Sequence, residues 1–377
     1  MKGRLPRTLM TTGGMGIGGA ETHIFELSKE LAARGMEVTV ASSGGVYADE
    51  LRGYGVKHVE IPFASRSPAD LLSAYRMTDS LLSRDAFDLI HAHARIPAMI
   101  CSRAARKHGL PFLTTAHLDF KVDPITRRLS RWGEETVAVS DDIKDYLVRE
   151  YRISPDNITV TVNGIDVERY SSSSPADPSE LIPPPPEGRR ILSVSRLDRD
   201  RSHTAFLLTA VAPDIHALYP DSDILIVGGG DDMTRIRAGA RAANEIIGRE
   251  YVKLTGPRTD IDRIVSTADI FVGVSRAALE AMAAGKATVL SGDQGYMGIY
   301  TADKLLSASE SNFCCRGRDV AEPRELKEDL LRLLAMSEGE LKALGDAARE
   351  TVEKHYSVKK MADDYLEVYS HLLNYPV

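Results

Sequence analysis

The sequence is poor in cysteine, which excludes a fold held together by disulfide bonds or by a structural zinc ion. Among its 377 residues are three cysteines, Cys101, Cys314 and Cys315. Three cysteines cannot build a disulfide framework. No pair of cysteines, with or without histidine, has the spacing of a structural zinc site. We therefore expect the fold to depend on an ordinary hydrophobic core.

Long apolar runs and a basic excess are also missing. No run approaches the roughly 18 apolar residues that cross a bilayer, and the first 30 residues lack a signal-peptide pattern. The formal net charge is −7, which argues against a general nucleic-acid binder. We expect a cytoplasmic protein, with the inner face of the membrane as an alternative location.

What the sequence has is a repeated alternation of β-like and helical patterns. It runs through residues 1–170, stops in a Ser- and Pro-rich stretch at 171–188, and resumes over 189–355. A C-terminal helix over 356–377 can cross back to the first lobe. This alternation is typical of βαβ units, so we predict an α/β fold with two doubly wound Rossmann-like lobes facing a cleft, the first on the acceptor side and the second on the donor side. Ligands in such sheets lie beyond the carboxyl ends of the strands.

The loop after the first strand reads TTGGMGIGGAETH (11–23). Its glycines let backbone approach a ligand closely, and the helix that follows offers free N–H groups to an anion. Gly14, Gly16 and Gly19 have the GxGxxG spacing, but no acidic residue ends the second strand, which disfavours NAD. The alternative is a tight turn with no ligand.

The first loop of the second lobe, SRLDRDRS (195–202), carries two arginines. Arg196 and Arg201 are able to hold a diphosphate with bidentate hydrogen bonds. The alternative is that they pair with Asp198 and Asp200 at the surface.

Taken together, these stretches resemble the family 4 glycosyltransferases, which have the two-lobed B-type (GT-B) fold. The landmarks follow the family's order over nearly the whole chain: GGAE (18–21), HAH (91–93), TAHLD (115–119), AVS (138–140), NGID (163–166), SRLDRDR (195–201), IVGGG (226–230) and LEAMAAGK (279–286). The resemblance implies that Gly16, Gly18 and Gly19 lie against the donor diphosphate. Arg196 and Arg201 would hold it from the second lobe, with Arg201 where the family usually has lysine. Gly256 to Arg258 would pass near the nucleobase.

The same resemblance assigns the carboxylate of Glu280 to the ribose hydroxyls of a nucleotide. A carboxylate accepts from two hydroxyl donors at once, and the alanines around it leave room for a ribose. The alternatives are a carboxylate that caps its own helix or pairs with Lys286.

His117, at a strand end, matches the family's active-site histidine beside the transferred sugar. His93 and Asn163 are assigned to the acceptor or cleft side, and a purely structural role for His91 and His93 is the alternative. The resemblance also implies retention of the donor's anomeric configuration and no bound metal or permanent cofactor.

One departure concerns the loop before Glu280. The family usually has an acidic residue eight positions earlier, where this chain has Val272. Ser275 and Arg276 run directly into the helix and would hold phosphate instead. In the segment 291–298, Asp293 and Gln294 are candidates for contacts with sugar hydroxyls.

We therefore predict a glycosyltransferase that moves a sugar from a UDP- or GDP-sugar to a glycan, lipid-linked or small-molecule acceptor. The alternatives are a sugar-nucleotide epimerase of the same fold and a nucleotide-sugar-binding protein without activity. The basic stretch 120–135, which holds Lys121, Arg127, Arg128, Arg131 and Trp132, either lies beside an acceptor groove or rests on an anionic membrane surface.

Overall fold

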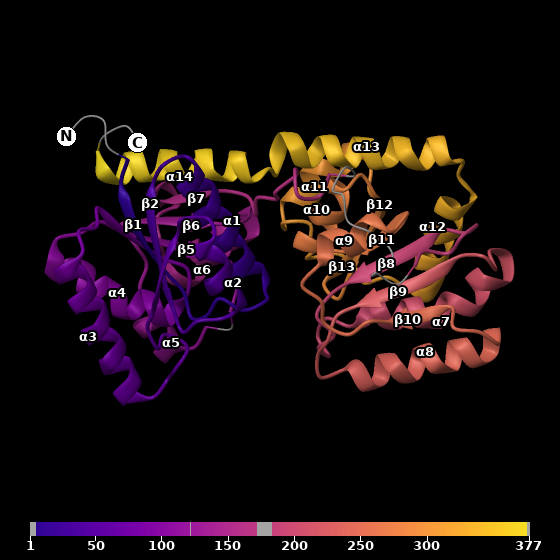
Figure 1. Ribbon diagram of the computed structural model, residues 1–377, viewed down its shortest axis with the longest axis horizontal. Helices are drawn as coiled ribbons and strands as arrows, with labels where there is room; N and C mark the ends of the chain where they lie inside the picture. The colour runs from indigo at the N-terminus through magenta and orange to yellow at the C-terminus, as the bar shows by residue number, and fades with distance from the viewer. Residues whose placement is uncertain (1–4, 121, 172–182, 375–377) are drawn as a thin grey trace. The chain divides into compact units, whose positions relative to one another are not determined.

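A computed structural model describes residues 5–120, 122–171 and 183–374, and it divides the chain into two compact units (Figure 1). The first unit comprises residues 1–164 together with 358–377, and the second comprises residues 165–357. The chain therefore passes twice between the units. Most of the Ser- and Pro-rich stretch that we predict as a linker, residues 172–182, lies outside the described residues.

The first unit contains a seven-stranded parallel sheet in the order β3-β2-β1-β4-β5-β6-β7. Its strands are β1 (Arg7–Thr11), β2 (Glu37–Ser42), β3 (Lys57–Glu60), β4 (Leu89–Ala92), β5 (Phe112–Ala116), β6 (Glu135–Ala138) and β7 (Ile158–Val160). Its helices are α1 (Gly19–Ala33), α2 (Val46–Arg52), α3 (Pro68–Arg84), α4 (Arg95–His108), α5 (Pro124–Leu129), α6 (Asp141–Tyr151), the 3-10 turn η1 (Pro155–Asn157) and α14 (Val358–Leu373).

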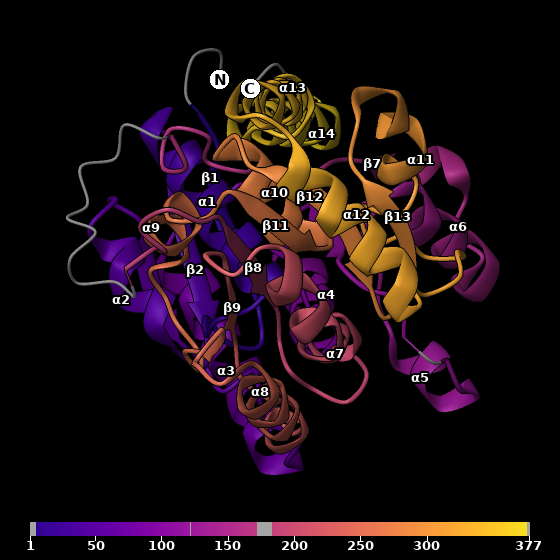
Figure 2. The ribbon, with the colours of Figure 1, turned by 90° about the vertical axis from the view of Figure 1, so that its right-hand side faces the viewer.

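The second unit contains a six-stranded sheet in the order β10-β9-β8-β11-β12-β13. Its strands are β8 (Arg190–Val194), β9 (Asp223–Val227), β10 (Val252–Leu254), β11 (Ile270–Gly273), β12 (Ala287–Gly292) and β13 (Gly295–Ile299). Its helices are α7 (His203–Leu218), α8 (Met233–Ile247), α9 (Ile261–Ser266), α10 (Ser275–Ala283), the 3-10 turn η3 (Ala302–Lys304), α11 (Leu305–Ser309), α12 (Pro323–Ala335) and α13 (Glu338–His355). Figure 2 shows α7 and α8 side by side.

The two sheets share the same strand order over their first four positions. In each, successive strands are added on one side of the strand that comes first in the sequence, and then on its other side. In the first unit the reversal lies between β1 and β4, and in the second between β8 and β11. Such switch points are where doubly wound sheets bind ligands, beyond the carboxyl ends of the strands. The prediction of two doubly wound α/β lobes is confirmed.

One edge of the second sheet differs from the predicted parallel pattern. β13 pairs antiparallel with β12, and the register shifts at Leu290 and Ser291. Residues 291–298, the segment of the candidates Asp293 and Gln294, therefore form most of a hairpin with these two residues at its turn. The pattern was hidden because glycines at 292, 295 and 298 give the segment the composition of a loop.

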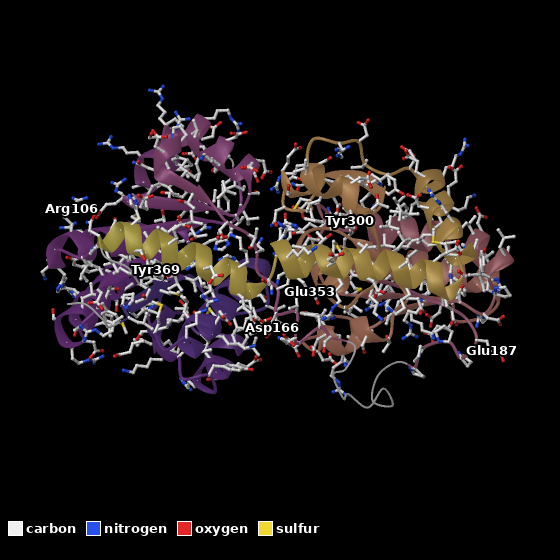
Figure 3. All side chains as sticks on the ribbon, turned by 90° about the horizontal axis from the view of Figure 1, so that it is seen from above. Arg106, Asp166, Glu187, Tyr300, Glu353 and Tyr369 are labelled. Carbon is white, nitrogen blue, oxygen red and sulfur yellow. The ribbon has the colours of Figure 1, made fainter. Side chains whose placement is uncertain are left out.

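The C-terminal helix α14 belongs to the first unit because it shares that unit's hydrophobic core. Met361, Tyr365 and Tyr369 are completely buried there with Ile24 and Leu27 of α1. A large apolar side chain contributes about 1.5–3 kcal/mol on full burial, so this contact is substantial. Figure 3 labels Tyr369 on α14, and the hydroxyl of Tyr369 bonds His91, which lies 278 positions earlier in the sequence.

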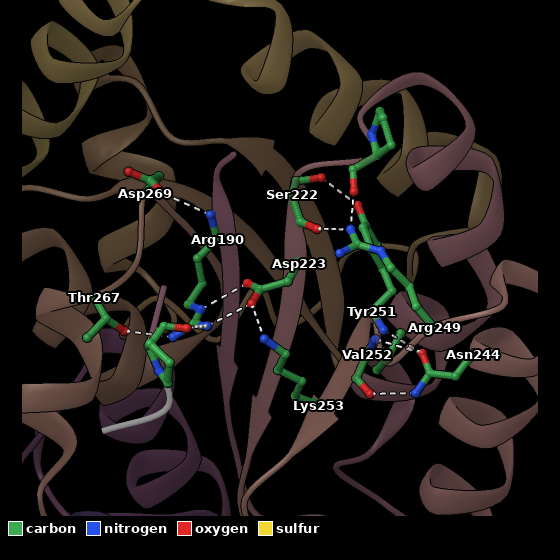
Figure 4. Close-up of polar contacts among 12 residues, drawn as sticks. Arg190, Ser222, Asp223, Asn244, Arg249, Tyr251, Val252, Lys253, Thr267 and Asp269 are labelled. Carbon is green, nitrogen blue, oxygen red and sulfur yellow. Dashed lines mark hydrogen bonds and ion pairs between the residues drawn. The ribbon is translucent and has the colours of Figure 1, made fainter. Parts of the chain in front are cut away.

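A buried ion pair ties the amino ends of the strands in the second sheet (Figure 4). Arg190 is completely buried and makes two parallel hydrogen bonds to Asp223, of 2.9 Å and 2.7 Å. Lys253 donates to the same carboxylate, and the backbone N–H of Arg190 donates to Asp269. These contacts join β8, β9, β10 and the start of β11. They stabilise the end of the sheet opposite to the expected ligand site.

Candidate functional site

Four polar residues that the sequence analysis considered lie at the carboxyl edge of the first sheet. His91 lies within β4 and His93 directly follows it, while His117 directly follows β5. Asn163 comes shortly after β7. Parallel strands end at the same edge of a sheet, so residues separated by up to 72 positions come together.

The glycine-rich loop between β1 and α1 has open space where side chains would be. A Cβ at Gly13, Gly16 or Gly19 would meet no other described atom within 4 Å, and none of the three has a positive φ. Packing and backbone conformation therefore do not require glycine at these positions. Helix α1 begins after Gly18 with no side-chain cap, which leaves N–H groups of its first turn for an anion. Both features fit a loop that a ligand approaches closely.

The loop between β2 and α2 packs against the glycine-rich loop. Met15 donates its backbone N–H to Gly44, and Tyr47 donates to Met15, each over 2.8–2.9 Å. Gly45 has φ 139° and a Cβ there would collide with the backbone of Met15. Glycine at 45 is thus required by the fold, whereas glycine at 16 is not.

His117 lies in a group of four imidazole rings. Nε2 of His117 is 3.1 Å from Nδ1 of His93, and the two rings are stacked with centroids 5.4 Å apart. His23 of α1 meets His117 edge-on at 4.8 Å. The ring of His91 lies 3.9 Å from that of His93. The structure thus brings the two candidates His93 and His117 together and adds His23 to them.

A chain of five hydrogen bonds connects this group to α14. Tyr369 bonds Nδ1 of His91 (2.9 Å), and Nε2 of His91 bonds Thr115 (2.7 Å). Thr115 bonds Tyr365 (3.0 Å), and Tyr365 bonds Nε2 of His23 (3.0 Å). Finally, Nδ1 of His23 bonds Oδ1 of Asn163 (2.8 Å). The residues of this chain, named the α14 chain below, are Tyr369, His91, Thr115, Tyr365, His23 and Asn163.

Burial keeps these histidines neutral. The pKa of His91, His93 and His117 lies well below the ordinary value, because burial disfavours the charged ring and the neighbouring histidines add repulsion. A neutral imidazole has one N–H donor and one acceptor nitrogen. At neutral pH these rings therefore act through hydrogen bonds rather than through charge.

Three of the rings are close enough to hold a metal ion. Nitrogen atoms of His23, His93 and His117 all lie within 4.8 Å of one another. Both ring nitrogens of His23 already bond Asn163 and Tyr365, however, so metal binding would require those bonds to be exchanged. The absence of a metal requirement stays a prediction.

In the second unit, three loops at the carboxyl edge are tied by backbone contacts. Leu197 donates to Gly229, and Gly228 donates to Gly256, each over 3.0 Å. A Cβ at Gly228 or Gly230 would collide with the backbone of residues 195–197. The IVGGG run thus lets the loops after β8 and β9 touch. A surface cavity of about 550 Å³ lies beside these loops, lined by Arg199, Asp231, Asp232, Thr234, Arg235 and Ala238.

The two arginines of the β8 loop differ in their surroundings. Arg196 is exposed, and its guanidinium makes no hydrogen bond or ion pair within the described part of the chain. Arg201 is half-buried, with its Nε 3.8 Å from Asp200. Arg196 is thus available to an anion, whereas pairing with Asp200, the alternative reading, applies to Arg201.

Arg258, assigned to the nucleobase region, is held by a neighbour. Its guanidinium makes two bonds to Asp260, of 2.8 Å and 2.5 Å. Gly256 has φ 78°, a conformation that favours glycine, and open space faces its Cβ position. The assignment of Gly256 and Arg258 to the nucleobase stays a prediction.

Glu280 pairs with Arg276 one turn earlier on α10. Nε of Arg276 is 2.8 Å from Oε1 of Glu280, and the residues are 9% and 8% exposed. Lys286, the partner weighed from the sequence, instead donates to the carbonyl of Ser266. The carboxylate of Glu280 has a second oxygen for hydroxyl donors. Arg276, expected to hold phosphate, orients Glu280 in this structure.

Ser275 begins α10 in a conformation that is rare for a residue with a side chain. Its φ is 57°, and its N–H donates to the carbonyl of Phe313 over 2.8 Å. No side chain in the described part of the chain caps helix α10. Strained backbone of this kind gathers at ligand sites, so Ser275 stays a candidate for phosphate contact.

Asp293, a candidate for sugar contacts, accepts a hydrogen bond from the backbone N–H of His203 over 2.9 Å. It therefore caps the start of α7. Burial raises the pKa of this carboxyl. The structure gives Asp293 this capping contact, and its role toward a sugar stays a prediction.

Sequence reasoning missed His23, Tyr365 and Tyr369. His23 follows the GGAE landmark directly, and its place in the first turns of a helix after a glycine loop was a usable signal. Tyr365 and Tyr369 have the i,i+4 spacing of one helix face, which is equally typical of ordinary core residues. Only the fold shows that their hydroxyls face the histidines.

The stretch 120–135 forms a short helix with an exposed apolar side. Helix α5 has six residues and is capped by Asp123. Ile125 is 72% and Leu129 50% exposed, and Leu118 and Phe120 are also exposed. Lys121 lies outside the described residues. None of the helices in the described ranges is both long and apolar enough to span a bilayer.

Comparisons with known proteins agree with this architecture. Residues 17–169 match the family described as Glycosyltransferase Family 4, and residues 188–355 match Glycosyl transferases group 1. The phosphatidyl-myo-inositol mannosyltransferase of Mycolicibacterium smegmatis is 28% identical over 73% of this chain and 72% of its own. The D-inositol 3-phosphate glycosyltransferase of Frankia alni is 29% identical over 48% of this chain and 51% of its own, so the match spans about half of that relative.

Solved structures share the fold. HepE of Anabaena, in complex with UDP and glucose, has a TM-score of 0.75 at 17% identity, over 97% of this chain and 99% of its own. Together, the two consecutive family matches, the paired doubly wound sheets and the ordered landmarks show that the chain belongs to the family 4 glycosyltransferases, enzymes of the two-lobed B type.

Proposed function

We propose that the chain transfers a sugar from a nucleotide-sugar donor to a glycan or lipid-linked acceptor with retention of the anomeric configuration. The observation that carries this proposal is that a cationic and an anionic side chain follow neighbouring strands at the carboxyl edge of the second sheet. The guanidinium of Arg196, which has no partner among the described residues, follows β8, and the buried carboxylate of Glu280 follows the neighbouring strand β11. A cation for a diphosphate beside an acceptor for ribose hydroxyls is the recognition chemistry of a nucleoside diphosphate.

In this proposal the second unit binds the nucleotide. Arg196 and Arg201 hold the diphosphate, and the N–H groups at the uncapped start of α10 assist them. Glu280, oriented by Arg276, accepts from the ribose. As the bond to the sugar breaks, negative charge grows on the leaving diphosphate, so these groups stabilise the transition state more than the ground state.

The first unit contributes to the transferred sugar and the acceptor. Gly16, Gly18 and Gly19 admit the donor to the loop before α1. Open space faces the Cβ positions of Gly16 and Gly19, whereas a Cβ at Gly18 would meet the side chain of Glu21. His117 contacts a sugar oxygen. The neutral state that burial imposes on His117 makes it a hydrogen-bonding group rather than a cation. Asn163, fixed by His23, lies at the same edge.

The acceptor side includes a membrane contact through residues 120–135. Exposed Ile125 and Leu129 can enter the interfacial layer, and Arg127 and Arg128 can meet anionic headgroups. The named activity of the mannosyltransferase relative, on a phosphatidylinositol lipid, supports a lipid-linked acceptor here. Sedimentation with anionic and with neutral vesicles tests this contact. Binding to anionic vesicles alone, lost in the Arg127→Glu/Arg128→Glu variant, is the expected result.

The function is tested first by ligand-induced stabilisation. We expect one of the UDP-, GDP- or ADP-sugars to raise the unfolding temperature, because a ligand that binds only the folded state stabilises it. The same donor should then be consumed with an acceptor present, also in excess EDTA. Epimerised donor without an acceptor would identify an epimerase, and binding without turnover across acceptors would identify an inactive binding protein.

A further inference from the structure

The contacts of His93 define where its proton lies. Nδ1 of His93 faces Nε2 of His117 at 3.1 Å, whereas Nε2 of His93 is buried and has no hydrogen-bond partner among the described residues. A buried N–H with no acceptor is rarer and more costly than a buried acceptor with no donor. The neutral ring of His93 therefore carries its proton on Nδ1, and Nε2 keeps the lone pair.

This assignment decides the state of His117. If Nδ1–H of His93 donates, Nε2 of His117 must accept, so the single proton of the neutral His117 ring is on Nδ1. Nδ1 of His117 makes no hydrogen bond within the described part of the chain. The ring is half-buried, so this nitrogen is not sealed in the core. His117 thus offers a free N–H donor.

We propose that His93 is a positioning residue that fixes His117 in its Nδ1–H tautomer, so that His117 donates a hydrogen bond to an oxygen of the transferred sugar. The role of His117 toward the sugar rests on the proposed function, but the tautomer does not. In a neutral histidine, the hydrogen bond that one ring nitrogen makes decides which of the two nitrogens carries the proton.

The surrounding packing holds both rings for this purpose. The ring of His93 packs between those of His91, which is tilted against it at a centroid distance of 3.9 Å, and His117, which is stacked on it at 5.4 Å. His91 is held in turn by Tyr369 and Thr115, and the edge of His23 packs against His117 at 4.8 Å. Rotation of either ring would disturb several buried contacts. The donor direction is therefore fixed by the protein before any ligand binds.

Two substitutions separate positioning from packing. In His93→Asn the side-chain amide nitrogen occupies nearly the place of Nδ1 and can still donate to His117. In His93→Leu the side chain has comparable bulk but no donor. If His93 only filled space, leucine would be the better replacement. If it fixes the tautomer, asparagine is.

The test is two-bond ¹H–¹⁵N NMR of the full-length chain labelled with ¹⁵N-histidine, at pH 7.5 and without ligand. We expect His117 to be Nδ1–H in the wild type and in His93→Asn, and to shift toward Nε2–H in His93→Leu. A wild-type His117 protonated on Nε2, or an unchanged tautomer in a folded His93→Leu, would overturn the proposal. The wild-type spectrum decides even if the leucine variant does not fold.

Kinetics then test the consequence for the sugar, with the donor that stabilises the chain. We expect kcat to fall about 10- to 100-fold in His93→Leu, with a KM for the donor within about twofold. This is less than the roughly 100- to 1,000-fold cost of deleting an oriented donor, because the ring of His117 is still present. His93→Asn should recover most of the loss. Equal losses in both variants would contradict positioning. Absence of any turnover in the wild type would count against the proposed function and leave the NMR result standing.

Discussion

The hydroxyl of Tyr365 lies 3.0 Å from Nε2 of His23, although the two residues are 342 positions apart in the sequence. In the α14 chain, the series of five hydrogen bonds that includes this contact, all donors point the same way along the series. Asn163 offers an oxygen that only accepts, so His23 donates from Nδ1 and accepts from Tyr365 at Nε2. It follows that Thr115 donates to Tyr365, that Nε2 of His91 donates to Thr115, and that Tyr369 donates to Nδ1 of His91. Bonds aligned in this way reinforce one another.

Removal of the Tyr365 hydroxyl should break this chain at its centre. We expect Tyr365→Phe to lower the free energy of unfolding by about 1–2 kcal/mol, because a buried acceptor and a buried donor each lose a partner. Turnover should fall as well, since His23 packs against His117. Urea unfolding followed by Trp132, the chain's one tryptophan, reports on the first unit.

The matched control is Tyr300→Phe, which also removes a buried hydroxyl bonded to a threonine, Thr351, but in the second unit (Figure 3). It should lower stability without lowering kcat at a temperature where both variants are folded. Equal effects of the two substitutions on kcat would show that Tyr365 has no special relation to the site.

The pair formed by Arg276 and Glu280 predicts a non-additive effect on stability. Glu280→Met alone leaves the buried guanidinium of Arg276 without its carboxylate and should cost about 1–3 kcal/mol. Replacing both residues with methionine removes the charges together and should cost less than the single change. Urea midpoints followed by circular dichroism measure this. A double variant that is less stable than Glu280→Met would refute the coupling.

Three glycines should respond differently to alanine. Gly16→Ala places a Cβ in open space, so stability should hold while kcat/KM for the donor falls at least tenfold, about 1.4 kcal/mol. Gly45→Ala forces a positive φ and a collision with Met15, and it should lose about 1–3 kcal/mol of stability. Gly339→Ala, in the open on α13, is the neutral control. Full activity of Gly16→Ala would argue against a ligand at this loop.

The buried histidines predict how stability depends on pH. The folded chain holds the pKa of His91, His93 and His117 below the ordinary value, so below about pH 6.5 the unfolded chain binds protons that the folded chain does not. Stability should be full above that pH and fall as pH drops through 6 toward the folded pKa values. The slope is at most about 1.4 kcal/mol per pH unit for each histidine.

Carboxylates do not account for a loss in this window. The pKa of Asp79 and Asp123 is lowered by hydrogen bonds, so their contribution disappears only in more acidic solution. Unfolding followed by Trp132 at pH 7.5, 6.5 and 5.5 gives the dependence for the first unit. A midpoint that stays constant or rises between pH 6.5 and 5.5 would contradict neutral buried rings.

The fold was largely accessible from the sequence because local patterns determine it. Alternation of strand-like and helical runs, with glycines at the strand ends, predicts both sheets and the edge at which His93 and His117 lie. The order of motifs also predicts the family. The antiparallel strand β13 escaped because its glycines resemble those of a loop.

The contacts of the site were less accessible because they join distant segments. No local pattern links Tyr365 to His23, or Asp293 to the start of α7. The Arg276–Glu280 pair is different, since its i,i+4 spacing was visible on the predicted helix. A search for partners one turn away would have favoured Arg276 over Lys286.

The central claim is that Arg196 and Glu280 of the second unit hold the nucleotide of the donor. The most direct measurement is calorimetric titration with UDP or GDP, whichever stabilises the chain, of the wild type, Arg196→Ala, Glu280→Ala and the control Arg237→Ala on an exposed face of α8. We expect Kd to rise roughly 5- to 150-fold in the first two variants, about 1–3 kcal/mol, and to stay constant in the control. Wild-type affinity in both Arg196→Ala and Glu280→Ala would contradict the account.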